Sequence, residues 1–189
     1  MLVPSEELLP RVAWEDFPKD VADRLRPRVA RLGYLGEFFR CAVHQPEALA
    51  AFIDFTETGK GSLPPRVVEI IALTCANWMG NEYERNQHER LSVRLGFGRD
   101  WVADVNRLDP DATRLPEEEK RVQALVLSVL NSRGHGAKAQ FEAMLAERGP
   151  EQAIAILMVV GRYVTHGVFI NTLGLKPPVP SIFEDGFTG

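Results

Sequence analysis

The chain has 189 residues, a length that favours one domain, or one domain with a short helical extension. Hydrophobic residues make up 45% and charged residues 25% of the sequence, which is ordinary for a globular protein. The net charge is −4, and no Lys- or Arg-rich block stands out, so nucleic acid is not an expected partner. No run reaches the roughly 18 apolar residues that a membrane span requires, so a membrane is not expected either.

The N-terminal residues have early acids and two prolines, and they lack the basic and apolar regions of a secretory signal. We therefore expect a cytoplasmic protein. The two cysteines, Cys41 and Cys75, lie far apart in the sequence and form no CxxC pair. Isolated cysteines in a cytosolic chain are usually buried small hydrophobes, and this is the expectation for both.

Apolar spacing and helix-terminus signals predict helices along nearly the whole chain. Prolines that suit a first helical turn occur at Pro46, Pro65 and Pro116, and the last of these is followed by three glutamates. Glycine-containing breaks separate the remaining segments, and no segment is typical of a strand. The sequence therefore predicts an all-α fold. The expected helices cover 19–31, 35–43, 46–57, 65–78, 81–95, 101–108, 116–133, 137–148 and 151–173.

Three regions are expected in chain order: an N-terminal arm and helix (1–34), a helical domain (35–176) and an extended C-terminal tail (177–189). The arm and the tail carry apolar residues that would be exposed on an isolated chain. Our hypothesis is that one or both wrap a neighbouring subunit, and the alternative for the last few residues is a disordered terminus. The apolar residues concerned are Leu8, Leu9, Trp14, Phe17, Ile182 and Phe183.

Glu69 stands out because it lies inside the most apolar helix of the first half of the chain, at the edge of the buried stripe. An unpaired carboxylate in such a place holds a proton more readily than one in water. A group that takes up and releases a proton near neutral pH suits general acid/base chemistry. The alternative is a structural salt bridge, with Arg66 or Arg85 as the partner.

The next predicted helix brings Asn81, Glu84 and His88 to one face, because they are spaced i, i+3 and i+7. Glu84 is one turn from His88, where a carboxylate would orient the imidazole, and Tyr83 could add a hydroxyl. The alternative is an ordinary solvated face. Since no HxxxH or HExxH pattern occurs, no metal site is expected. For His166, which lies in an apolar helix, a hydrogen-bonded core histidine is the expectation.

These residues resemble the signature of the carboxymuconolactone decarboxylase and alkylhydroperoxidase-D-like superfamily. The resemblance rests on Arg66-Val-Val-Glu69 and on Asn81-Glu-Tyr-Glu-Arg-Asn-Gln-His88, with supporting segments between about residues 35 and 176. It implies a multi-helix orthogonal fold and an active site between the helices that carry Glu69 and His88. It also implies a homo-oligomer, from dimer to hexamer.

The chain departs from the redox members of that family at the cysteine pair. Those members carry a Glu, a CxxC pair and a His in this order, and their cysteine positions fall here at Asn81 and Glu84. Thiol–disulfide chemistry needs a nucleophilic thiolate and a resolving thiol, and neither residue supplies one. Cys75 belongs to the preceding helix and is a poor substitute.

The resemblance and the departure together predict a cofactor-free acid/base enzyme on a small organic acid or lactone, of the decarboxylation or isomerisation type. Glu69 and His88 would move protons and Glu84 would orient His88. Asn81, Tyr83 and Trp78 are the expected substrate-binding residues. Two alternatives stay open, an antioxidant reductase like the redox members and a non-catalytic oligomeric binding protein, because one fold hosts many chemistries.

Overall fold

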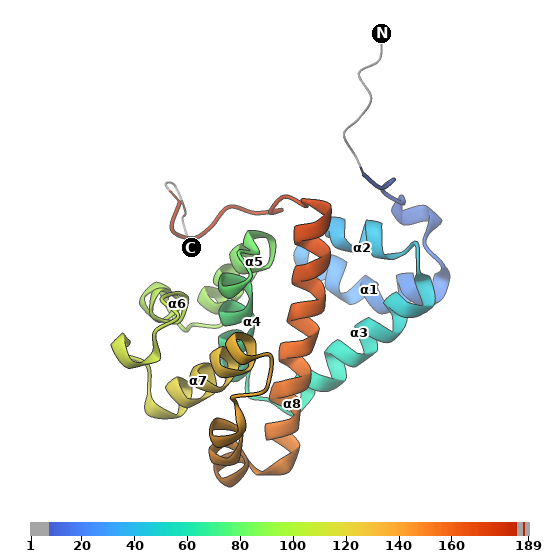
Figure 1. The fold of residues 1–189 in the computed structure, drawn as a ribbon. Helices are drawn as coiled ribbons and strands as arrows, with labels where there is room; N and C mark the ends of the chain where they lie inside the picture. Colours follow the sequence, from blue (N-terminus) through green and yellow to red (C-terminus); the bar gives the residue numbers. More distant parts are fainter. Residues whose placement is uncertain (1–7, 185–186, 188–189) are drawn as a thin grey trace.

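The computed structural model describes residues 8–184 and 187, and every regular element within them is helical (Figure 1). The described residues contain no strand, and the expected all-α class is confirmed. Two 3-10 turns, η1 (Trp14–Asp16) and η2 (Pro110–Ala112), accompany eight helices. The helices are α1 (Lys19–Leu32), α2 (Glu37–Ala42), α3 (Pro46–Gly61), α4 (Pro65–Trp78), α5 (Glu82–Arg94), α6 (Arg99–Asn106), α7 (Glu117–Ser132) and α8 (Lys138–Leu173).

Most helix boundaries lie where the terminus signals place them. Pro46 and Pro65 occupy the first turns of α3 and α4, where a missing N–H costs no hydrogen bond. Pro116 precedes α7, whose first turn holds three glutamates at the positive end of the helix dipole. The left-handed residue Gly33 ends α1 by donating its N–H to the carbonyl of Val29.

The end of α3 differs from the expectation. The sequence predicts that this helix stops before Thr58, but it continues to Gly61. A glycine in a helix costs about 1 kcal/mol relative to alanine, a penalty that tertiary packing can outweigh. Here a Cβ on Gly59 would lie 3.5 Å from Cγ2 of Val159, an ordinary contact distance, so this turn of α3 packs beside α8. The extra turn carries Lys60, whose side chain is partly buried, to the wall of a cavity described below.

The helix α8 runs through the centre of the molecule, with α1, α2 and α3 on one side and α4 to α7 on the other (Figure 1). It bends at Gly149, whose φ of 76° and ψ of 171° are not helical, and Pro150 follows, as the sequence predicts. Its second segment is long and apolar enough to cross a membrane, but 56% of that window is buried within the protein. We interpret it as the core helix.

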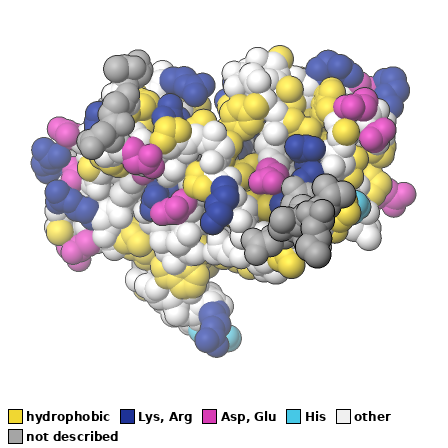
Figure 2. Space-filling model, turned by 90° about the horizontal axis from the view of Figure 1, so that it is seen from above, with side chains coloured by type: hydrophobic (Ala, Val, Ile, Leu, Met, Phe, Trp, Pro, Cys, Tyr) yellow, Lys and Arg dark blue, Asp and Glu magenta, His cyan; other side chains and the backbone are white. Residues whose placement is uncertain are grey.

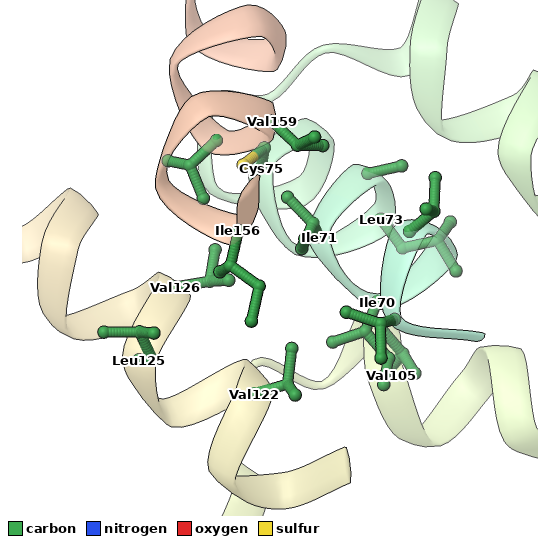
Figure 3. Packing of buried hydrophobic residues seen from close by; sticks show 14 of the residues in the cluster. Ile70, Ile71, Leu73, Cys75, Val105, Val122, Leu125, Val126, Ile156 and Val159 are labelled. Atoms are coloured by element: carbon green, nitrogen blue, oxygen red, sulfur yellow. The ribbon is translucent and has the colours of Figure 1, made fainter. Parts of the chain in front are cut away.

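Two hydrophobic clusters share helix α8, which contributes buried residues to both. The larger one surrounds α4 and includes Ile70, Ile71, Cys75 and Ile156, as Figure 3 shows. The smaller one joins α1, α2 and α3 to the ends of α5 and α8. Because Glu69 belongs to α4, it is held by the first cluster at the boundary with α5.

Parts of the expected arm and tail pack against their own chain. Phe17 is buried in the smaller cluster and Ile182 in the larger one. The buried carboxylate of Glu89 accepts hydrogen bonds from Ser181 Oγ at 2.5 Å and from the backbone N–H of Ile182 at 3.1 Å. Phe17 and Ile182 are therefore unavailable to a neighbouring subunit, which corrects the wrapping hypothesis for them. Leu8 and Phe183 stay exposed, and residues 1–7, 185–186 and 188–189 lie outside the described residues.

Candidate active site

Glu69 and His88 meet in the interior between α4 and α5. Glu69 Oε2 lies 2.8 Å from His88 Nδ1, and Ser92 Oγ donates a second hydrogen bond to the same oxygen at 3.2 Å. Ser92 follows His88 by one helical turn, so both point from α5 toward α4. The alternative partners are engaged elsewhere, since Arg66 pairs with Glu119 and Arg85 with Glu82 and Glu89.

The charge of His88 is set by its two carboxylate neighbours. Burial opposes protonation of the ring, but the charge and hydrogen bond of Glu69, with a smaller contribution from Glu84, raise the pKa of His88 above its ordinary value. In the imidazolium both nitrogens donate, Nδ1–H to Glu69 and Nε2–H to the hydroxyl oxygen of Tyr163 at 3.2 Å. Burial raises the pKa of Tyr163 well above its ordinary value, so Tyr163 keeps its proton. The raised pKa thus favours the protonated, acid form of His88.

Glu84 is held mainly by α8 and not by His88. Its Oε1 accepts a hydrogen bond from Arg162 Nη1 at 2.6 Å, while His88 Nε2 is 3.6 Å away. Burial alone would raise the pKa of Glu84, but His166, which is protonated only at low pH, together with Arg162 and His88, lowers it well below its ordinary value. The position that orients His88 through Nδ1 is occupied by Glu69, whereas the sequence assigned the orienting role to Glu84.

His166 lies beside Glu84 and is neutral at physiological pH. Burial, with the charges of Arg162 and His88, lowers the pKa of His166 to about 3, although Glu84 acts in the opposite direction. Its Nδ1 is 3.5 Å from Glu84 Oε2, without the geometry of a hydrogen bond, and its ring packs on Phe38. Because His166 is uncharged, Arg162 is the cation that balances Glu84 near pH 7. The expected hydrogen-bonded core histidine is therefore buried but incompletely satisfied.

A small cavity of about 100 Å³, lined by both polar and apolar side chains, lies between α1, α2, α3, α5 and α8. It reaches His88, Glu84 and Tyr83, and it is larger than the roughly 30 Å³ that one water occupies. Typical pockets for drug-sized ligands start near 300 Å³, so this cavity suits only a compact molecule. Its walls carry five basic side chains against one acidic side chain, Glu84. The basic residues are Arg28, Arg31, Lys60, Arg94 and Arg162.

Solved structures with this arrangement of helices exist, although no protein-family model and no curated protein matches the sequence. An alkylhydroperoxidase AhpD core structure, of an uncharacterized peroxidase-related protein from Ralstonia eutropha JMP134, has a TM-score of 0.76 at 20% identity. The match covers 89% of this chain and 90% of that one.

Two structures of the debrominase Bmp8 are similar as well. A Cys→Ala variant in complex with 2,3,4-tribromopyrrole has a TM-score of 0.75 over 89% of this chain and 90% of that one. The apo form has a TM-score of 0.76 over 90% and 91%, and both are 17% identical to this chain. The chain has the alkylhydroperoxidase AhpD-like fold. The fold expected from the resemblance is therefore confirmed.

Two of the expected substrate-binding residues do not line the cavity of this AhpD-like chain. Asn81 is buried and caps α5, because its Oδ1 accepts the backbone N–H of Glu84 at 3.1 Å. Trp78 donates its Nε1–H to Asn131 Oδ1 at 2.8 Å and lines a separate, mostly apolar groove of about 650 Å³ along α7 and α8. The third, Tyr83, borders the cavity, and its hydroxyl oxygen accepts the backbone N–H of Phe38 at 3.3 Å.

Several residues at the site were not found from the sequence. Arg162, Tyr163 and His166 come from α8, and Lys60 comes from the extra turn of α3. A signal was present for two of them, because Arg162 and His166 are polar residues one turn apart in the most apolar helix. Like Glu69, an arginine in such a helix is almost never fully buried unless it is paired.

Among residues 8–184, no cluster of three or more His, Cys, Asp and Glu side chains could hold a metal ion. The thiol of Cys75 lies among apolar side chains, beside Val159 in Figure 3, and is fully buried. Burial raises the pKa of the Cys75 thiol, so the reactive thiolate is disfavoured. Cys75 therefore has the environment of a packing residue.

We expect both thiols of the folded chain to be unreactive toward Ellman's reagent, because Cys41 and Cys75 are buried. Both should react after unfolding in guanidinium chloride. Measuring the absorbance of the released thiolate before and after denaturation checks this. Rapid labelling of Cys75 in the folded chain would contradict the packing role and revive thiol chemistry.

Proposed function

We propose that the chain is a cofactor-free acid/base enzyme of the decarboxylation or isomerisation type, acting on a small organic acid or lactone. The proposal rests on a buried chain of contacts that runs from Glu69 through His88 to Tyr163. His88 also borders the cavity, whose lining includes five basic side chains. Glu69 holds the imidazolium in place, and His88 can give its Nε2 proton to a carbon or oxygen of the substrate.

The chemistry of these reactions fits the charges of the site. Decarboxylation and many isomerisations pass through an enolate or carbanion, which fixed donors and positive charges stabilise in a site that excludes water. His88 supplies a proton, and the basic side chains of the cavity attract a carboxylate. The cavity volume restricts the substrate to a compact molecule.

The redox alternative has little support in the residues. The similar structures include a peroxidase-related protein and a debrominase, but this chain has Asn81 and Glu84 at the two cysteine positions of the redox members. Asn81 is committed to capping α5 and Glu84 to Arg162. Cys75 is sealed in the core, so neither a nucleophilic nor a resolving thiol faces the cavity.

The test is a panel of compact 3-oxo acids, hydroxy acids and lactones incubated with the full chain in deuterated water. Release of carbon dioxide reports decarboxylation, and deuterium incorporated at carbon reports proton transfer by the site. We expect at least one compound to react, at a rate that falls when His88 is replaced. Absence of both signals across the panel, with compounds that bind nevertheless, would favour the non-catalytic binding protein.

We also propose that the chain forms a homo-oligomer, from dimer to hexamer, through the exposed side of α8. On that side of α8, five uncharged residues are spaced alternately four and three positions apart, which is the spacing of residues in a helix–helix contact. The members of this stripe are exposed although three of them are large and apolar, and such a surface is usually covered by a partner. They are Ile154, Met158, Gly161, Thr165 and Val168.

Met158→Glu is expected to dissociate the oligomer, because burying a carboxylate in an apolar contact costs several kcal/mol. Ala143→Glu adds the same charge at an exposed position before the bend of α8, and it should leave the oligomer intact. Light scattering coupled to size exclusion measures the mass of each. Equal masses for Met158→Glu and the unchanged chain would exclude this stripe as the interface.

The remaining partner and location predictions are unchanged. On the face seen in Figure 2, Lys and Arg side chains are interspersed with Asp and Glu and form no continuous basic field. This charge distribution does not favour nucleic acid, so a small molecule is still the proposed partner, and a cytoplasmic protein that binds no membrane is still the expectation.

A further inference from the structure

Lys60 differs from the other lysines of the chain in its surroundings. It lines the same cavity as His88 and Glu84, and its Nζ lies 5.1 Å from the ring centroid of Tyr163. Three other lysines pair with a carboxylate one helical turn away, but within residues 8–184 Lys60 forms no ion pair. Its amine therefore faces the cavity without a fixed acidic partner. The three paired lysines are Lys19, Lys120 and Lys138.

The groups around Lys60 weaken its hold on a proton. Burial, together with the positive charge of Arg162, lowers the pKa of Lys60 to about 8. Arg28 on α1 acts in the same direction, while Glu84 on α5 and Glu69 on α4 act against it. About one amine in ten is then unprotonated at pH 7, far more than for a lysine in water. A lysine beside another cation in a desolvated pocket is the usual form of a nucleophilic amine.

Two further cations provide a place for a carboxylate. Arg31 from α1 and Arg94 from α5 line the cavity, are largely exposed, and form no ion pair within the described residues. Guanidinium groups bind carboxylates through paired hydrogen bonds. A compact acid held by these side chains would place the rest of its carbon skeleton in the cavity that Lys60 and His88 border.

We propose that Lys60 forms an imine with the carbonyl carbon of a compact 3-oxo acid whose carboxylate is drawn in by Arg31 and Arg94. This rests on the proposed function, because it names the substrate class and the nucleophile of the same site. It assigns a covalent role to a residue that the acid/base mechanism alone does not use.

The steps balance without any further reagent. The Nζ lone pair attacks the carbonyl carbon and a C–N bond forms. The oxygen leaves as water, with one proton from the amine and one from His88, and a protonated imine remains. The bond to the carboxyl carbon then breaks, carbon dioxide leaves, and the electron pair moves to the imine nitrogen. His88, reprotonated from water, protonates the carbon, and water hydrolyses the imine to release the ketone and free Lys60.

Reductive trapping tests the imine directly. The full chain is incubated with acetoacetate, reduced with sodium borohydride and mapped by peptide mass spectrometry. We expect an adduct at Lys60 in preference to the exposed lysines, which serve as internal references. Trapping should increase with pH around 8, where the amine loses its proton. An adduct absent from Lys60, or spread evenly over the exposed lysines, would overturn the proposal.

Lys60→Arg keeps the positive charge and removes the amine, so it should abolish trapping and lower carbon dioxide release by about 10²-fold or more. Lys138→Arg, at an exposed lysine outside this cavity, is the matched control and should change neither. If Lys60→Arg releases carbon dioxide at the unchanged rate while His88→Ala does not, the imine is overturned and the acid/base function stands. If Lys60 is trapped but His88→Ala keeps full turnover, the acid/base role fails and the imine stands.

Discussion

Replacing His88 by alanine is expected to lower turnover by about 10²-fold or more, with a much smaller change in KM. Of the two histidines of the site, His88 has a raised pKa that favours its charged form, whereas burial lowers the pKa of His166 to about 3. The acid that protonates the reacting carbon or oxygen is therefore lost in this variant. Rates of carbon dioxide release or deuterium incorporation measure the effect. His135→Ala, in an exposed turn, is the matched control and should keep the full rate.

Glu69→Gln separates the charge of Glu69 from its place in the structure. The charge of Glu69 is the largest influence that raises the pKa of His88, so an amide should let that pKa fall toward its ordinary value of 6.5. Because the acid form of His88 is the active one, the alkaline limb of the pH–rate profile should move to lower pH. An unmoved limb would show that another group sets it.

Glu69 and His88 also make the stability of the fold depend on pH, and the raised pKa of His88 fixes the direction of that dependence. The folded-state pKa of His88 is raised, so its contribution to stability is present below the unfolded value of about 6.5 and is lost as pH rises through the folded value. Because Glu69→Gln makes the pKa shift of His88 smaller, it should also make the loss of stability at rising pH smaller. If both His88→Ala and Glu69→Gln only lower the free energy of unfolding and leave turnover unchanged, the pair is structural.

The sequence predicts the part of the site that lies on neighbouring helices. Glu69 and His88 are found because the helix between Pro65 and Met79 and the one that begins after Asn81 are joined by a short turn, so their facing residues are constrained. Helix starts at proline and stops at glycine follow local chemistry, and most of them lie where predicted. Local patterns therefore place the Glu69–His88 pair once the resemblance has singled out these two residues.

Contacts between distant segments are not predicted in this way. Tyr163 and Arg162 reach the site because α8 packs on α3, α4 and α7, which no local pattern specifies. Lys60 was missed because its helix continues past Gly59 to Gly61, although a glycine normally favours a helix end. The contact between Glu84 and Arg162 was also missed, since the two residues are 78 positions apart in the sequence.

Replacing Arg162 by methionine is expected to have the largest effect on stability, a loss of about 3–5 kcal/mol. Arg162 is 4% exposed, its Nη1 is 2.6 Å from Glu84 Oε1, and its Nε donates to Thr56 Oγ1 at 3.4 Å. Methionine fills much of the space but leaves the carboxylate of Glu84 buried beside a neutral His166. Denaturant unfolding measures the change. Arg121→Met, which breaks the surface pair with Glu147, is the control and should cost less than about 1 kcal/mol.

A double variant and the pH dependence of stability show whether Arg162→Met loses stability because it leaves the charge of Glu84 unpaired. Glu84→Gln combined with Arg162→Met removes both charges, so it should recover most of the stability that the single variant loses.

In the unchanged chain the depressed pKa of Glu84 gives stability that is present above about pH 4.5 and is lost as the pH falls through the folded-state pKa. In Arg162→Met one of the positive groups that lower this pKa is gone, so the pKa of Glu84 should rise and the loss of stability on acidification should be smaller than in the unchanged chain. A double variant no more stable than Arg162→Met, with the pH slope unchanged, would mean that Arg162 acts through packing on Phe52 and Tyr163 and not through its charge.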